Sequence, residues 1–418
     1  MRSNERERVS PQTFWLWVTL FVIQMQPLEI LFSGYDPSFP STAYSARVYS
    51  VYFRLIIALY TAWLMAKDLK KVRFFLSLAW PFVLFIFYAS LTSAYVGSPI
   101  EANRYILMTV FPVAITPIAA AILFRPIDYM RIWATALAML CVISLATVIF
   151  IPSIGIIVKT EIGGIGSPGN WRGAFASKNI LGHVSSITLS IILICNTNLI
   201  KNIYYLVLLI LISAFCLIFS SSSTGYIIAI SLPAFYISFI KPKGAYRIIA
   251  IMSSMAFVAA MLFYRDDIVR FFLAAVGKSA DLTGRAAIWE MAASMIPDSG
   301  LLGKGINYTT TPEFMQRLKS LFGVGYIHNE FLDSIINLGI VGSLIFYFSF
   351  AHAIFKSWSV NLSGSLKVAR YGFTIMLLGW LISGITETTN YNMLAFCFVP
   401  LFGLLAVRNR YDAAMAHA

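Results

Sequence analysis

The sequence has few charged residues. Asp, Glu, Lys and Arg make up 12% of its 418 residues, while hydrophobic residues make up 59%. Roughly a quarter of the residues of a soluble domain are charged, so this composition excludes a soluble globular protein and predicts an integral membrane protein. Since each membrane-crossing helix uses about 20 apolar residues, little chain remains for separate soluble domains. We expect a single membrane domain over residues 1–418.

Cysteine and histidine are also scarce, with four of each in the chain. No two cysteines have the spacing of a metal site, and all lie inside apolar runs, where a packing role is expected: Cys141, Cys195, Cys216 and Cys397. Asp266 and Asp267 form a carboxylate pair, but no further ligands accompany them. We therefore predict no metal ion.

The sequence also lacks the common cofactor and nucleophile motifs. Residues 300–305 do not have the spacing of a phosphate-binding P-loop, and no Ser or Thr follows Lys304. The serines at 220–223 lack the Gly-x-Ser-x-Gly setting of a hydrolase nucleophile. We expect these serines to cap helix ends at a tight turn, and we predict no cofactor.

Long apolar runs dominate the rest of the chain. The first run, 14–32, is too long for a signal peptide, contains Pro27 and Glu29, and has no clean small-residue cleavage site, so we interpret it as a retained span. Each later run is long enough to cross a membrane. The sequence therefore predicts an all-α polytopic membrane protein with about 12 transmembrane helices, over 14–32, 48–66, 74–96, 105–124, 132–151, 180–196, 203–219, 225–240, 248–264, 330–354, 371–385 and 393–407.

The formal net charge of +13 raises the question of nucleic acid binding. The basic residues lie in short connectors between spans, however, and more than half of the 31 Lys and Arg fall on one side of the predicted bundle. The positive-inside rule assigns that side to the cytoplasm, and no nucleic-acid partner is expected. Both termini are then cytoplasmic. The Gly-rich loop 153–179, the serine cluster 220–223, the loop 265–329 and the Glu387 turn face outward.

The long outer loop 265–329, between spans 9 and 10, is predicted to be helical. Thr283 precedes a helix start that should end before Pro297. Thr311 is a cap residue followed by Pro312 in the first turn of a second helix. The apolar stripe of this helix either packs on neighbouring elements or lies on the membrane surface, and packing is the commoner case: Phe314, Leu318, Leu321 and Phe322.

Two arginines on the outer face are candidate phosphate ligands. Arg172 lies in a Gly-rich segment directly before a span, and a guanidinium matches phosphate oxygens as a planar fork. Lys178 adds a point charge nearby. Arg285 occupies the first turn of its predicted helix, where the helix dipole disfavours a cation, so we expect it to serve another purpose. The alternatives are an arginine that contacts lipid headgroups for Arg172 and a solvated surface arginine for Arg285.

His328 is the histidine best placed for chemistry, because it lies where the long outer loop re-enters the membrane. An imidazole can accept a proton near neutral pH. Asn329 is a candidate for orienting it, and Asp333 follows about a turn later. Glu387 either pairs with one of the arginines or is a solvated turn carboxylate.

Three other positions have structural and functional interpretations. Gly339 and Gly342 are expected to permit close helix packing rather than to touch substrate. Arg54, inside the second span, either contacts substrate or snorkels to the interface.

Three stretches together resemble the O-antigen ligase and Wzy-type polymerase superfamily. They are the segment from Trp171 to Gly182, the segment from Thr283 to Trp289, and His328-Asn329 followed after nine residues by Gly339 and then Gly342. The last is similar to the family's His-(Asn/Ser/Gln)-nine-residue-Gly pattern. The resemblance covers about 150–345. It departs from the family at 220–225, where many relatives carry an arginine among the serines.

The resemblance implies a GT-C-like helical fold and a glycan transferase at the periplasmic face of the bacterial inner membrane. The implied donor is a glycan linked to undecaprenyl diphosphate. Carried onto this sequence, Arg172 and Arg285, with Lys178 as an addition, hold the diphosphate, and His328 lies at the acceptor hydroxyl. Two arginines can neutralise the leaving group without a divalent metal, and direct displacement would invert the anomeric carbon.

The acceptor is left open by the sequence. A ligase transfers the finished glycan to lipid A-core or another acceptor, as in lipopolysaccharide synthesis, whereas a polymerase adds it to a growing glycan such as an exopolysaccharide. A glycolipid flippase or transporter also has about a dozen spans, but it predicts charges near the bilayer midplane and two matching halves. The sequence shows almost no midplane charge and no obvious internal repeat.

Overall fold

The computed structural model describes residues 9–25, 40–93, 103–157, 168–175, 177–199, 202–240, 285–388 and 394–416. Within these ranges the chain is helical, and the only β pairing is an isolated bridge between Ile156 and Trp171. The first half contains α1 (Pro11–Gln24), α3 (Pro40–Ala66), α4 (Leu69–Leu78), α5 (Trp80–Ser93), η1 (Ile106–Val110), α7 (Phe111–Leu123), α8 (Pro126–Phe150), α9 (Pro152–Gly155), α10 (Lys178–Leu199) and α11 (Ile203–Ser220). The second half contains α12 (Ser223–Phe235), η2 (Tyr236–Ile240), α15 (Arg285–Ser294), α16 (Ile296–Ser299), η4 (Tyr308–Thr310), α17 (Pro312–Phe322), α18 (Glu330–Trp358), α19 (Gly364–Gly384) and α20 (Leu394–Met415).

The prediction of an all-α, multi-pass membrane protein is confirmed. Among the described residues, seven helices are long and apolar enough to cross a membrane, or eight if α4 and α5, which meet at an 82° bend, form one broken span. Val51–Ala66 and Ser223–Ser238 are shorter apolar helices. Of the about 12 predicted runs, 248–264 lies outside the described residues, as do residues 26–32 of the first run.

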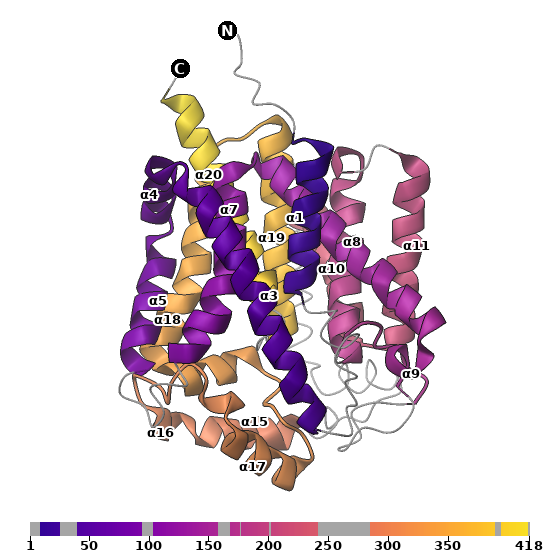
Figure 1. Ribbon diagram of the computed structural model, residues 1–418, viewed down its shortest axis with the longest axis vertical. Coiled ribbons are helices and arrows are strands. Elements are labelled where there is room, and N and C mark those ends of the chain that lie inside the picture. Colours follow the sequence, from indigo (N-terminus) through magenta and orange to yellow (C-terminus); the bar gives the residue numbers. More distant parts are fainter. Residues whose placement is uncertain are drawn as a thin grey trace.

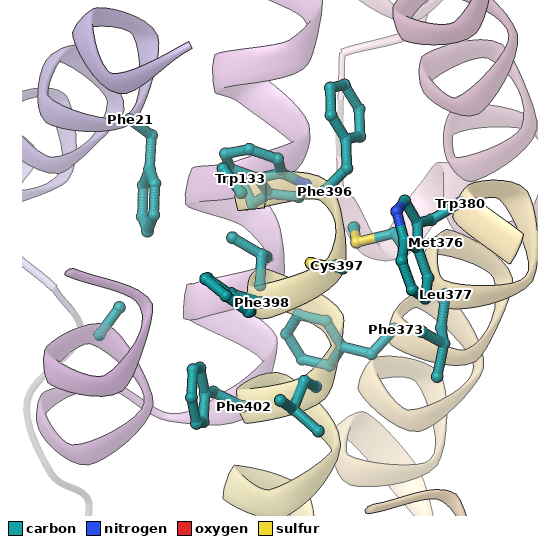
Figure 2. Close-up of a cluster of buried hydrophobic side chains, with 14 of the residues drawn as sticks. Phe21, Trp133, Phe373, Met376, Leu377, Trp380, Phe396, Cys397, Phe398 and Phe402 are labelled. Atoms are coloured by element: carbon teal, nitrogen blue, oxygen red, sulfur yellow. The ribbon is translucent and has the colours of Figure 1, made fainter. Parts of the chain in front are cut away.

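The core of the bundle is built around α20, which is apolar on all sides as expected of a central helix. Its residues from Ala395 to Val407 are all buried, and Gly403 packs directly on the Phe373 ring. Figure 2 shows Phe396, Phe398 and Phe402 of α20 among side chains of α1, α8 and α19. Edge-to-face ring contacts, which aromatic pairs prefer, join Phe21 of α1 to Trp133 of α8 and Trp133 to Phe396 of α20.

Figure 1 shows α9, α15, α16 and α17 at one end of the bundle. The first turn of α1 and the last turn of α20 lie at the opposite end from α9 and α15–α17. Hydrogen bonds join loops that are distant in sequence: the Trp171 amide donates to the Phe219 carbonyl (2.9 Å), and the Thr224 and Thr386 hydroxyls are 2.5 Å apart. The described parts of the segments predicted to face outward therefore share one end.

The predicted cap at the serine cluster is confirmed. Ser222 is the N-cap of α12, and its hydroxyl accepts from the Gly225 amide at 3.3 Å. Ser221 adopts a left-handed conformation (φ 49°) that ends α11. The cluster forms the tight turn between two apolar helices.

The segment 300–305 packs against a break in α18. Gly339 has φ 68° and ψ −178°, which interrupts the helix. Backbone amides of Lys304 and Gly305 donate to the Ile336 and Asn337 carbonyls (2.9 and 2.8 Å), and the Val341 amide donates to Leu301 (3.1 Å). A side chain on Gly339 would overlap the Leu301 carbonyl, just as one on Gly342 would overlap the Tyr88 ring. Gly342 permits close packing of α18 on α5, as predicted, whereas Gly339 permits the close approach of the 301–303 backbone rather than of another helix.

The described part of the long outer loop has a small hydrophobic core of its own, separate from that of the bundle. Its buried members come from α15, α17, α18 and the segments between them: Ile288, Ala292, Met295, Phe314, Leu318, Val324, Ile327 and Ile336. Thr311 caps α17 by accepting from the Phe314 amide, and α15 ends before Pro297, as predicted. Phe314 and Leu318 are buried, so the apolar stripe packs on neighbouring elements, while Leu321 remains 57% exposed.

Candidate functional site

Glu387 lies in the turn that follows α19, where its backbone amide donates to the Ser383 carbonyl. Three side chains from distant parts of the chain contact its carboxylate. Oε1 accepts from Arg285 Nη2 (3.0 Å) and Asn179 Nδ2 (2.6 Å), and Oε2 lies 3.1 Å from His328 Nδ1. Arg285 Nη1 also donates to the Thr386 carbonyl at 2.6 Å. The structure thus brings Arg285, His328 and Glu387 together.

The charge of Glu387 follows from these neighbours. Burial raises the pKa of the carboxyl, but the His328 imidazole, the Arg285 guanidinium and the His183 imidazole together lower it to about 2. Glu387 is therefore ionised at neutral pH. An ionised carboxylate only accepts hydrogen bonds, so His328 Nδ1 is the donor in their contact.

His328 is held in place from several directions. Its side chain is 1% exposed, and its backbone has φ 56°, which is uncommon for a residue other than glycine. The Trp289 indole donates to the carbonyl of the preceding Ile327 (3.2 Å), and the Tyr326 ring packs on the imidazole with centroids 4.1 Å apart. Nε2, the other ring nitrogen, is buried without a hydrogen-bond partner among the described residues. The imidazole is thus oriented through Nδ1, and Nε2 is left for another molecule.

Arg285 is the first residue of α15, and its side chain is only 14% exposed. The helix dipole disfavours a cation at this position, so helix stability does not explain the arginine. Its ion pair with Glu387 does. A solvated surface arginine does not describe this residue.

Arg172 and Lys178 lie at the same end of the bundle, and both are buried. Arg172 Nε donates to the Ile154 carbonyl (2.6 Å), and its backbone amide donates to Gly155, which ties the residue to α9. Those contacts do not include Glu387. Lys178 begins α10, directly before Asn179, so the chain places it beside the Glu387 contact.

Asn329 and Asp333 have roles other than orienting His328. The Asn329 side chain caps α18 by accepting from the Leu332 amide (3.0 Å) and donates to the Ile385 carbonyl (3.1 Å). Asp333 Oδ2 accepts from Asn337 Nδ2 (3.0 Å), and Asn337 in turn contacts Thr309. Asn329 and Asp333 therefore fix the start of α18, while Glu387 contacts the ring.

Sequence reasoning missed Asn179 as a Glu387 ligand and His183 as its neighbour. His183 follows Asn179 by four residues on α10, hence on the same helix face, and it is fully buried. That spacing is the signal that could have found it. Arg54 is buried as well, with 2% exposure, so its side chain lies within the bundle rather than snorkelling to the surface. In the described part of the chain, no group of three His, Cys, Asp or Glu is placed to hold a metal ion.

The family model of the O-antigen ligases matches residues 208–347, which include Arg285, His328 and the Gly339–Gly342 break. The chain is also similar to the exopolysaccharide production protein ExoQ of Rhizobium meliloti (strain 1021). The two are 25% identical over 407 residues, which cover 89% of this chain and 87% of that protein. These two similarities support the O-antigen ligase and Wzy-type polymerase superfamily for this chain.

The same similarities support a membrane glycosyltransferase-type enzyme of polysaccharide biosynthesis, of the ligase or polymerase kind. The superfamily acts on lipid-linked glycans in a membrane. The resemblance noted in the three sequence stretches is therefore confirmed.

Proposed function

We propose that the protein transfers a glycan from an undecaprenyl-diphosphate carrier to an acceptor hydroxyl at the periplasmic face of the bacterial inner membrane. The observation that carries this proposal is the state of His328: Nδ1 is fixed on the ionised Glu387, and Nε2 is unpartnered among the described residues. An imidazole oriented by a carboxylate is a suitable general base for a hydroxyl.

The reaction follows from this arrangement. The acceptor oxygen attacks the anomeric carbon of the donor glycan from the side opposite the diphosphate, and its proton passes to His328 Nε2. The bond between the anomeric carbon and the diphosphate oxygen breaks, and the carrier diphosphate leaves with the electron pair. A single displacement inverts the anomeric configuration. Glu387 stabilises the imidazolium that forms.

Cationic side chains supply the second requirement, which is to neutralise the developing charge on the leaving diphosphate. A guanidinium has five N–H donors, and the Arg285 contacts with Thr386 and Glu387 occupy only two of them. We assign the remaining donors, together with Arg172 and Lys178, to the diphosphate. The proposed mechanism needs no metal ion.

Binding requires a rearrangement over His328, because Nε2 is covered in the present conformation. The Tyr326 ring lies against the imidazole and is itself 36% exposed. We propose that this ring moves aside when the acceptor enters.

The proposed orientation has both termini in the cytoplasm and the loops 153–179 and 265–329 in the periplasm. We propose ligation to lipid A-core or a related acceptor as the reaction. Polymerisation, with a growing glycan as the acceptor, is the second candidate, favoured by the similarity to a protein named for exopolysaccharide production.

The test is transfer by the purified protein in liposomes that contain a carrier-linked glycan and each candidate acceptor, with the mass gain of the acceptor as the readout. His328→Ala should slow transfer by at least about a hundredfold, and Arg172→Ala or Arg285→Ala should abolish it while the protein still inserts. His352→Ala is the matched control, since His352 lies on α18 and contacts the Leu78 carbonyl away from Glu387. Normal transfer by His328→Ala would overturn the assignment of His328 as the general base. Normal transfer by both arginine variants would overturn the assignment of Arg172 and Arg285 to the diphosphate.

A further inference from the structure

His183 is the second imidazole near Glu387, and the reaction described above does not use it. It lies on α10, which packs between α8, α11, α12 and α19. Asn179, one turn earlier, donates directly to Glu387. Since His183 follows Asn179 by four residues, its side chain lies on the helix face that Asn179 presents to Glu387.

Both ring nitrogens of His183 are buried without a hydrogen-bond partner among the described residues. A buried imidazole in this state is costly, because its donor and its acceptor have both lost water and gained nothing in return. His352, by contrast, has a carbonyl partner at 3.1 Å. Among the described residues, the buried imidazole nitrogens without a partner are on His183 and His328. His328 contacts Glu387 directly, and His183 lies one helix turn after Asn179, which also does.

Glu387 does not satisfy His183: its described side-chain contacts are with Arg285, Asn179 and His328, and neither His183 nitrogen has a hydrogen-bond partner among the described residues. The missing partner of His183 must therefore come from outside the described chain. A neutral imidazole offers one N–H donor and one acceptor nitrogen. A hydroxyl group matches both, whereas a phosphate oxygen can only accept.

We propose that His183 is a further substrate-binding residue, which hydrogen-bonds a non-reacting hydroxyl of the transferred glycan. This inference rests on the proposed function, because it takes the donor glycan as the molecule next to His328. The glycan hydroxyl pairs one of the two His183 nitrogens when substrate is bound. In the described part of the chain both nitrogens lack a hydrogen-bond partner, which carries a cost in stability.

This cost yields a test that separates binding from packing. His183→Leu has similar bulk and no polar atoms, so removal of two unsatisfied nitrogens should leave the melting temperature unchanged or raise it. The same variant should lower kcat/KM for the carrier-linked glycan by about tenfold or more, chiefly through a higher KM. His183→Gln, which retains a donor and an acceptor, should recover part of the loss.

The measurements are transfer kinetics and thermal unfolding of the wild type and the two variants in the same detergent, with His352→Leu as the matched control. Wild-type kinetics for His183→Leu would overturn the proposal, since an ordered water would then suffice as the partner. So would a joint loss of stability and activity, which indicates a packing role. A changed pH–rate profile with an unaltered KM would overturn it as well, because His183 would then transfer protons.

The same experiment distinguishes this inference from the function on which it rests. If the wild type transfers no glycan, or if His328→Ala transfers normally, the proposed function fails. If the wild type transfers, His328→Ala does not, and His183→Leu is normal, only the inference about His183 fails.

Discussion

At the scale of single residues, Glu387 organises the site. One carboxylate accepts from side chains of α10, α15 and the loop before α18, so its position fixes the relative placement of Asn179, Arg285 and His328. Contacts within such a buried network support one another. The loss of Glu387 should therefore affect the imidazole and the guanidinium together.

Replacement of Glu387 by Gln tests this role. The amide has nearly the same shape but no charge, and it cannot accept from three donors at the same time or stabilise an imidazolium. Glu387→Gln should reduce glycan transfer by about a hundredfold or more, with insertion into the membrane retained. Glu290→Gln on the exposed face of α15 is the control. Transfer within a few-fold of wild type would show that His328 does not need the carboxylate.

The depressed pKa of Glu387 gives a second prediction at this scale. Its pKa of about 2 in the folded protein lies below the ordinary value of 4.5. The stabilising contribution is thus present above about pH 4.5 and lost as the pH falls towards 2. The melting temperature of the wild type should drop more steeply between pH 5 and pH 3 than that of Glu387→Gln. Equal slopes of melting temperature against pH in the two proteins would contradict the lowered pKa of Glu387. Any change in transfer rate near neutral pH must come from another group.

At the scale of secondary-structure elements, the break in α18 joins the outer segment to the bundle. The backbone of 301–305 hydrogen-bonds to carbonyls and an amide that the break at Gly339 exposes. Asn337 and Asp333 lie in the two turns before the break, where their side chains contact each other and Asn337 also contacts Thr309. The nine-residue spacing from His-Asn to glycine therefore sets how far the imidazole lies from the contact between the segment 301–305 and the break in α18.

Gly339→Ala should destabilise the protein. The positive φ alone costs a residue with a side chain about 1–3 kcal/mol, and the added methyl group would overlap the Leu301 carbonyl. Gly300→Ala is a matched control: Gly300 also has positive φ (60°), but its Cβ would meet nothing within 4 Å. The melting temperature in detergent should fall further for Gly339→Ala. Equal losses of melting temperature in the two variants would mean that the positive φ, and not the close contact with Leu301, explains the glycine at 339.

Local patterns in the sequence predicted the elements well, because caps and prolines act within a few residues. Thr311-Pro312 starts α17, Pro297 limits α15, and Ser222 caps α12, each as expected. The convergence on Glu387 was predicted only in part. Arg285 and His328 were assigned to one face, but hydropathy does not fix how α10 and α19 rotate about their axes. That rotation decides that Asn179 and His183 face Glu387, while Asn329 turns to cap α18.

At the scale of the whole molecule, the site lies at one end of the bundle and the outermost turns of α1 and α20 lie at the other (Figure 1). The small core of α15, α17 and the start of α18 sits over the first end and carries both Trp289 and Ile327. A substrate with a lipid tail can approach such a site from the bilayer while its sugars remain in water. The proposed donor requires this end to be periplasmic.

Thiol labelling decides the orientation. The four native cysteines are buried, so the unmodified protein should react little with a membrane-impermeant maleimide. Glu313→Cys introduces an exposed thiol on α17, and Met415→Cys introduces one at the last turn of α20, where the native side chain is 58% exposed. In right-side-out vesicles, Glu313→Cys should be labelled at once and Met415→Cys only after permeabilisation. The reverse pattern would place His328 in the cytoplasm, where no acceptor destined for the cell surface would reach it in the proposed reaction.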